Sequence, residues 1–256
     1  MSDLEITVKR IQPADAPQAY CCMTEVPTPW GESLCVCRDW IAQNLGRYVE
    51  GYHAQMADGQ VVGHLYYAPS ESALFAYEVE PGAAVLYCDW VQRRYQRQGI
   101  RRRLLDTFVS DMRKSQRKGI LVECTDLEGQ MHYRHYQACG FQIVHEAGRR
   151  KLMYLALTQP STSVRPLKSN VLPRHGVPVE ILILSGYLCP FEVSTQMLLL
   201  EVAREFGERV VLRQESLTPE TLLRYGVASG VFINGRHKLT GATTEEAIRQ
   251  AIAEEM

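Results

Sequence analysis

The stretch Val85–Leu105 reads VLYCDWVQRRYQRQGIRRRLL and decides the fold of the first half of the chain. Residues 85–91 are mostly apolar and rich in valine and aromatic residues, which predicts a buried strand. A short polar segment containing Gly99 follows, and a helical pattern then begins. Its apolar side carries Ile100, Leu104, Leu105 and Phe108. A strand that feeds directly into a helix leaves backbone N–H groups at the helix start, and these groups suit a phosphate or pyrophosphate.

Six arginines crowd this junction, which favours an anionic ligand. They are Arg93, Arg94, Arg97, Arg101, Arg102 and Arg103. Consecutive helical residues project about 100° apart, so 101–103 cannot all hold one ligand and some must remain solvated. An exposed basic helix start is the structural alternative. Nucleic-acid binding is a rival reading that the balanced overall charge and the lack of a recognition motif do not favour.

At these residues the chain resembles the acetyl-CoA loop of the GNAT N-acetyltransferase superfamily, Gln/Arg-x-x-Gly-x-Gly/Ala. The segment Gln96-Arg97-Gln98-Gly99-Ile100-Arg101 matches at Gln96 and Gly99, but Arg101 replaces the small third residue. Because a small residue lets backbone approach a ligand closely, the arginine puts the detailed pyrophosphate geometry in question. The resemblance implies acetyl-CoA as co-substrate and these binding residues: Val91, Gln96, Arg97, Gln98, Gly99, Ile100, Arg101 and Arg102.

A second motif follows at the distance that the superfamily shows. Residues 119–126 predict another buried strand, and a helical pattern then ends in Tyr136-Gln-Ala-Cys-Gly140-Phe141, similar to the superfamily's Tyr-x-x-x-Gly-Phe. Gly140 suits the left-handed residue that closes a helix, and Phe141 suits the core of the next strand. The resemblance covers roughly residues 5–157. It implies direct attack of an amine on the thioester, with Tyr136 as the general acid, whereas a packed core tyrosine is the structural alternative.

The general base is less clear from the sequence. Strand alternation predicts Val85, Tyr87 and Asp89 on one face and Leu86, Cys88 and Trp90 on the other, so Asp89 is one candidate. Glu123 on the neighbouring strand is a second, and His132 or His135 can serve near Tyr136. An aromatic pocket for the amine, or simple core packing, explains a further set: Trp30, Trp40, Tyr48, Tyr52, Tyr66 and Tyr67.

Composition places the chain among ordinary globular proteins of one large or two modest domains. Its 256 residues are 46% hydrophobic and 22% charged, and the net charge of −1 gives no preference for nucleic acid or an anionic membrane. No apolar run approaches the length of a membrane span, and the acidic, strand-like N-terminus is unlike a signal peptide, so we expect a cytoplasmic protein. The eight cysteines are expected to be reduced thiols. Those at 21, 22, 35 and 37 lack the spacing of a zinc site, so no metal is expected.

The order of predicted elements is an α/β (α+β) arrangement with a central mixed sheet, followed by a smaller domain. We predict an N-acetyltransferase-like domain over residues 1–157, a linker over 158–178 that is rich in proline and serine, and a second domain over 179–256. Asp58-Gly59 and Asn234-Gly235 are strong hairpin signals within the two domains.

The second domain resembles a thioredoxin-like fold in the order of its elements. Cys189 lies at a strand-to-helix junction, where a helix N-terminus can stabilise a thiolate. Glu192 stands where a Cys-x-x-Cys motif has its second cysteine, and Ser229-Gly230 stands where that fold has its cis-proline. We therefore do not expect dithiol exchange. Over its whole length the chain resembles GNAT proteins with an appended small domain, such as the YoaP-like group.

The sequence thus predicts an acetyl-CoA-dependent N-acyltransferase with Tyr136, Asp89 and Glu123 as catalytic candidates and an unidentified amine as acceptor. Two alternatives stay open: a non-catalytic acyl-CoA sensor or binding module, which Arg101 favours, and a monothiol redox or soft-metal protein centred on Cys189. The sequence leaves a homodimer open.

Overall fold

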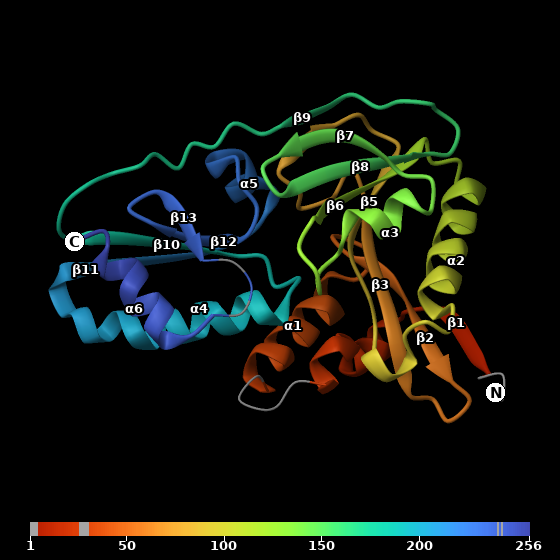
Figure 1. Ribbon diagram of the computed structural model, residues 1–256, viewed down its shortest axis with the longest axis horizontal. Coiled ribbons are helices and arrows are strands. Elements are labelled where there is room, and N and C mark those ends of the chain that lie inside the picture. The colour runs from red at the N-terminus through yellow and green to blue at the C-terminus, as the bar shows by residue number, and fades with distance from the viewer. Residues whose placement is uncertain (1–4, 26–30, 240, 242) are drawn as a thin grey trace. The chain divides into compact units, whose positions relative to one another are not determined.

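The computed structural model describes residues 5–25, 31–239, 241 and 243–256, which form two compact units. The first unit holds most of the chain up to Arg165. The second holds the chain from Pro166 onward, with Leu74–Ala76 and residues 31–40 of helix α1 (Gly31–Asn44). Each unit has its own sheet and its own hydrophobic core, and each is described by itself (Figure 1).

The first unit is built on a seven-stranded mixed sheet in the order β1-β2-β3-β5-β6-β8-β7. Neighbouring strands are antiparallel except β5 and β6, which are parallel. The expected mixed α/β class is confirmed. The strands are β1 (Ile6–Arg10), β2 (Glu50–Met56), β3 (Val61–Pro69), β5 (Ala83–Val91), β6 (Gly119–Thr125), β7 (Gln142–Ala147) and β8 (Arg150–Ala156).

Helix α2 (Ile100–Lys114) covers one face of this sheet and contacts β1, β2, β3 and β5. Its predicted apolar side is confirmed, because Ile100, Leu104 and Phe108 lie in the core with sheet residues such as Leu65. Burying one such side chain contributes roughly 1.5–3 kcal/mol. A short helix, α3 (Tyr133–Gln137), ends at Gly140, whose φ of +91° confirms the predicted left-handed residue.

A hairpin turn and a small second sheet complete this part of the structure. The Asp58-Gly59 turn joins β2 to β3 as predicted, with Gly59 at a φ of +86°. A separate two-stranded sheet pairs β4 (Tyr77–Val79) with β9 (Val164–Pro166). The proline-rich segment from residue 158 to 178 therefore contains a short strand.

The second unit has a four-stranded sheet in the order β11-β10-β12-β13, comprising β10 (Val179–Ser185), β11 (Val210–Ser216), β12 (Gly230–Ile233) and β13 (Arg236–Leu239). β10 is parallel to β11 and antiparallel to β12. The Asn234-Gly235 turn, with both φ angles positive, forms the predicted β12–β13 hairpin.

Both faces of β10 are buried, which explains its nearly continuous apolar sequence. Ile181 and Ile183 pack in one core with residues of α4 (Pro190–Ala203) and α6 (Glu245–Ala253). Leu182 and Leu184 face the opposite side, with Tyr225 at the end of α5 (Pro219–Tyr225).

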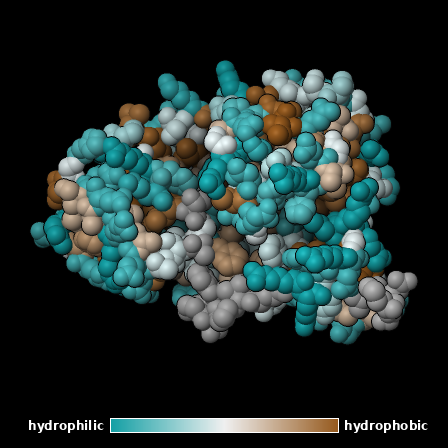
Figure 2. All heavy atoms as spheres, in the orientation of Figure 1, coloured by the Kyte–Doolittle hydropathy of each residue, from teal (hydrophilic) through white to brown (hydrophobic). Residues whose placement is uncertain are grey.

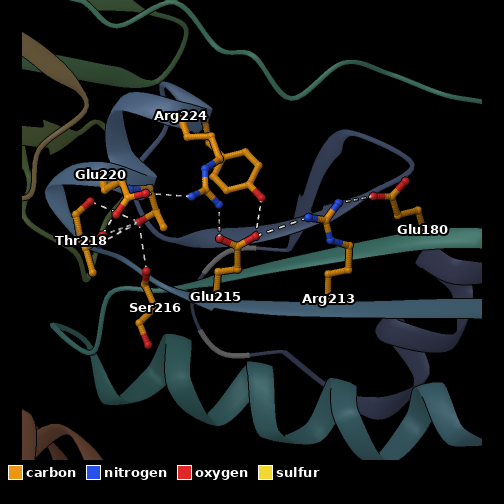
Figure 3. A network of polar contacts seen from close by, with 9 residues as sticks. Glu180, Arg213, Glu215, Ser216, Thr218, Glu220 and Arg224 are labelled. Atoms are coloured by element: carbon orange, nitrogen blue, oxygen red, sulfur yellow. Dashed lines mark hydrogen bonds and ion pairs between the residues drawn. The ribbon is translucent and has the colours of Figure 1, made fainter.

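A charged network covers the edge strand β11 (Figure 3). Glu215 accepts hydrogen bonds from Arg224 Nη1 at 2.9 Å and from the Tyr225 hydroxyl at 2.5 Å, and Arg213 approaches the same carboxylate at 3.5 Å. Thr218 caps α5 by accepting the Thr221 N–H at 3.2 Å. Charged side chains on an edge strand discourage pairing with another chain.

Hydrophilic residues dominate the face of the molecule shown in Figure 2, and hydrophobic residues appear there as separate patches. None of the helices in the described part of the chain has the length and apolarity that a bilayer crossing requires.

Candidate functional site

The central feature of the first unit is a fork between its two parallel strands. β5 and β6 pair over four residues, Ala83–Leu86 against Gly119–Val122. Beyond this point β5 continues beside β3 as far as Val91, whereas β6 continues beside β8 as far as Thr125. The strand fork, as we call this divergence, therefore opens at Tyr87 on one strand and Glu123 on the other. The two strands therefore no longer pair with each other beyond Leu86 and Val122.

A β-bulge at the mouth of the fork changes which way the β5 side chains point. Tyr66 pairs with Cys88 and the next residue, Tyr67, pairs with Leu86, so Tyr87 is an extra residue. The predicted alternation is wrong for this reason. Asp89 lies on the face of Leu86 and Val91, towards α2, and Cys88 lies on the opposite face.

Asp89 belongs to a buried cluster with Arg101 and Tyr136, the Arg–Asp–Tyr cluster. Arg101 donates from Nε to Asp89 Oδ2 at 2.9 Å and from Nη2 to Oδ1 at 2.7 Å. The Tyr136 hydroxyl donates to the same Oδ1 at 3.1 Å. The guanidinium also lies over the Tyr136 ring, 5.0 Å from its centroid. The structure thus brings together the candidates Asp89 and Tyr136 with the arginine that departs from the loop motif.

The cluster keeps Tyr136 protonated. Burial raises the pKa of the Tyr136 hydroxyl well above its ordinary value, and the Asp89 carboxylate raises it further, while Arg101 opposes both. Burial by itself lowers the pKa of Arg101, but the attraction and hydrogen bonding of Asp89 and Tyr136 together outweigh it and raise this pKa. A neutral tyrosine and a neutralised carboxylate–guanidinium pair therefore lie side by side at neutral pH.

The loop between β5 and α2 has the geometry of an anion cradle. After a 3₁₀ turn at 93–95, Arg97 and Gly99 adopt positive φ angles of 61° and 75°, and α2 begins at Ile100. Left-handed residues next to a helix start turn successive N–H groups towards one point. A Cβ added at Gly99 meets no atom within 4 Å, so open space borders the loop.

Several of the predicted binding residues already have contacts within the protein. Gln96 donates to the Val91 carbonyl at 2.9 Å and so fixes the loop to the end of β5. Gln98 donates to the Arg94 carbonyl at 3.4 Å, and Arg102 pairs with Asp106 one turn later. Ile100 is a core residue, and Arg101 is directed to Asp89.

Exposed cations remain near the loop. Arg93, Arg94 and Arg97 are exposed, and Arg94 lies over the Tyr95 ring at 4.8 Å. Together with the helix N-terminus, these cations favour an anionic group such as a pyrophosphate.

Glu123 lies at the mouth of the fork on the opposite face from Asp89. Val122 and Cys124 point into the core beneath α2, so Glu123 between them points away from it. The Tyr77 hydroxyl donates to Glu123 Oε2 at 2.8 Å, and Arg150 approaches Oε1 at 3.7 Å. With 31% of its side chain exposed, this carboxylate remains accessible to a substrate.

The other two predicted bases, His132 and His135, lie near each other with ring centroids 6.1 Å apart. His132 caps α3 by accepting the Arg134 N–H at 3.3 Å and stacks on Tyr133. Burial lowers the pKa of His135, and the nearby Arg101 lowers it further.

Most residues of the proposed aromatic pocket are core residues. Tyr52, Tyr66 and Tyr67 are each at most 2% exposed, and Tyr52 stacks on Tyr67 with ring centroids 5.9 Å apart. Tyr52 and Tyr67 pack against Phe108 of α2, whereas Tyr66 lies on the opposite face of the sheet against Tyr20 and His64. Trp40 and Tyr48 are half-buried, and Trp30 lies outside the described residues.

The sequence reasoning missed a buried polar group behind β5. The imidazole of His64 contacts the thiols of Cys21 at 3.3 Å and Cys88 at 3.6 Å and stacks on Tyr66. Burial lowers the pKa of His64 to about 3, and His53 contributes to the shift. His64 is therefore neutral at physiological pH. A histidine within an otherwise apolar strand was the available signal.

In the second unit, Cys189 precedes the first residue of α4, as predicted. Its expected thiolate stabilisation is outweighed, because burial raises the pKa of the thiol to about 12 and the Glu192 carboxylate contributes to the rise. Ser229 donates to Glu192 Oε2 at 2.7 Å, which links the first turn of α4 to the residue before β12.

Comparison with known proteins gives structural likeness at low sequence identity. No protein-family model matches the chain, and no curated protein matches it significantly. One similar structure is an acetyltransferase of the GNAT family from Desulfovibrio desulfuricans, with 21% identity and a TM-score of 0.47 over 59% of this chain and 99% of that one. A second is the ribosomal-protein-S18-alanine N-acetyltransferase of Escherichia coli, with 18% identity and a TM-score of 0.44 over 61% and 96%. A third is a GNAT family acetyltransferase from Brucella melitensis in complex with acetyl-CoA, with 20% identity and a TM-score of 0.42 over 62% and 94%.

Proposed function

We propose that the first unit is an acetyl-CoA-dependent N-acetyltransferase that acts on an amine. The observation that carries the proposal is the continuity of the strand fork with the anion cradle at 96–102, beside a buried, protonated Tyr136. Both loop motifs of the resemblance lie at this place. The cradle binds the CoA pyrophosphate, and the fork receives the extended part of CoA that ends in the thioester.

The chemistry assigns different roles to the two carboxylates. Glu123 takes a proton from the ammonium group of the acceptor, and the neutral amine then attacks the thioester carbon. The carbon–sulfur bond breaks, CoA leaves as a thiolate, and Tyr136 supplies the proton that yields free CoA. The attacking nitrogen loses its second proton to solvent as the amide forms, and the Tyr136 phenolate regains a proton from solvent. Asp89 is not the base in this proposal, because its side chain is only 1% exposed and forms a bidentate pair with Arg101, whereas the Glu123 side chain is 31% exposed.

The second unit supports a thioredoxin-like assignment through its topology. A βαβ unit followed by an antiparallel hairpin and a helix, with the first strand central, is the order that the sequence resemblance implies. We place the boundary of this domain after the segment 158–178. A thiol with a pKa of about 12 next to Glu192 favours a binding or structural role over redox exchange.

One further function is favoured by a specific observation. Because Arg101 and Tyr136 are both bonded to Asp89, the unit can bind acyl-CoA without turning it over and act as a sensor.

Release of free CoA from acetyl-CoA, measured across a panel of amino acids, polyamines, arylamines and peptide N-termini, tests the proposal. Amine-dependent release that is lost in Glu123→Gln supports the enzyme. Acetyl-CoA binding without release under any amine supports the sensor, and absence of binding contradicts both.

A further inference from the structure

We infer that Arg101 is a positioning residue of the proposed reaction, which fixes Asp89 against the Tyr136 hydroxyl and balances the charge that Tyr136 acquires when it gives up its proton. The inference rests on the proposed function and assigns a role to the residue that departs from the loop motif.

The geometry shows that Arg101 is directed to this cluster and not to the loop. Two of its N–H groups meet the two oxygens of Asp89, at 2.9 and 2.7 Å. A bidentate arrangement fixes both the position and the plane of the carboxylate. The Asp89 side chain is only 1% exposed, so solvent cannot replace the guanidinium.

The position of Arg101 in the fold makes this contact specific. It is the second residue of α2, and its neighbours in the sequence, Ile100 and Arg102, face the core and solvent respectively. The guanidinium therefore reaches back from the helix start to Asp89 of β5 and lies over the Tyr136 ring of α3. It links α2, β5 and α3.

The charges around Tyr136 explain why an arginine is needed. Transfer of the Tyr136 proton to the CoA thiolate leaves a buried phenolate beside the Asp89 carboxylate. Two adjacent buried anions without a cation are strongly unfavourable. With the Arg101 guanidinium beside them, the phenolate and the carboxylate carry a net charge of only minus one. Other titratable groups near the cluster include the Cys88 thiol, which faces the opposite side of β5, the Cys124 thiol, whose pKa burial raises, and His135, whose pKa burial lowers.

Kinetics of Arg101→Gln, with Arg113→Gln as matched control, form the first arm of the test. Arg113 is exposed on the last turn of the same helix. Arg101→Gln should lower kcat roughly 10²-fold, the order expected for impaired acid catalysis, with a much smaller change in KM for acetyl-CoA. Arg101→Lys keeps the charge but loses the bidentate contact, so we expect only partial recovery. Wild-type kcat in Arg101→Gln overturns the inference.

The second arm does not depend on activity. NMR of protein labelled with carbon-13 tyrosine reports the pKa of Tyr136, whose signal is identified by its loss in Tyr136→Phe. This pKa is compared between Asp89→Asn and the double variant Asp89→Asn/Arg101→Gln. The double variant removes both charges, so it strands no buried ion. The pKa should be about one unit higher in the double variant, because a nearby cation favours the phenolate. Equal values overturn the inference. If the wild type shows no acetyl transfer, the proposed function fails, and this arm still decides whether Arg101 acts on Tyr136.

Discussion

Replacing Asp89 by asparagine should destabilise the first unit far more than an ordinary surface change. The substitution keeps the size of the side chain but leaves the Arg101 guanidinium without its counterion. Removing one partner of a buried ion pair costs about 3–5 kcal/mol. Arg101 is 31% exposed and regains some hydration, and the asparagine oxygen still accepts one hydrogen bond, so we expect about 2–3 kcal/mol.

Scanning calorimetry of the full chain measures this loss as a shift in Tm. For a unit of this size about 1 kcal/mol corresponds to 2–4 °C, so the transition of the first unit should fall by about 4–12 °C. Asp106→Asn is the matched control, because it breaks the exposed pair with Arg102 on the same helix, where both side chains are about 60% exposed. A solvent-screened pair of this kind contributes little to stability, and its loss should shift Tm by less than about 2 °C. Equal shifts in the two variants would refute the claim that Asp89 and Arg101 form a structural pair.

Three further predictions concern single groups. Glu123→Gln should lower turnover roughly 10²–10⁴-fold while acetyl-CoA affinity is retained. The control Glu128→Gln, at an exposed position, should leave turnover unchanged. An unchanged kcat in Glu123→Gln excludes Glu123 as the base. With its pKa raised to about 12, Cys189 should react slowly with iodoacetamide at pH 8. Glu192→Gln should speed this reaction, because the substitution removes a negative charge beside the thiol. A wild-type protein that reacts faster than Glu192→Gln contradicts this prediction. The pKa of His64 is about 3 in the folded protein and about 6.5 in the unfolded chain. Between about pH 6.5 and pH 3, therefore, the imidazole of His64 is protonated in the unfolded chain but not in the folded protein. Folding stability should therefore fall as pH drops below about 6.5, by up to about 1.4 kcal/mol per pH unit, and urea unfolding of His64→Gln should lack this contribution.

Much of the fold could be predicted because local chemistry fixes it. The left-handed residues of Asp58-Gly59 and Asn234-Gly235 specify hairpins whatever surrounds them. The apolar spacing of Ile100, Leu104 and Phe108 defines the buried side of α2 in the same way. Gly140 marks the end of a helix because few other residues adopt its φ.

The site could be predicted only in part, because its geometry depends on long-range pairing. The bulge at Tyr87 arises from the register between β3 and β5, and it turns Asp89 away from the face that simple alternation predicts. The partner of Arg101 lies twelve residues earlier on another element, so sequence spacing suggests an anionic ligand for it instead. Cys189 illustrates a different reason, since a helix start favours a thiolate only where burial and a neighbouring carboxylate do not outweigh it.

Hydrogen exchange with and without acetyl-CoA tests the central claim most directly, because it locates the ligand without requiring the acceptor amine. Saturating acetyl-CoA should slow exchange in peptides covering residues 92–103 and in those covering the mouth of the fork near Tyr87 and Glu123. The second unit serves as the internal reference and should show no comparable change. Protection confined to other segments, or no protection anywhere at saturating acetyl-CoA, would contradict the assignment of the fork and cradle as the acetyl-CoA site.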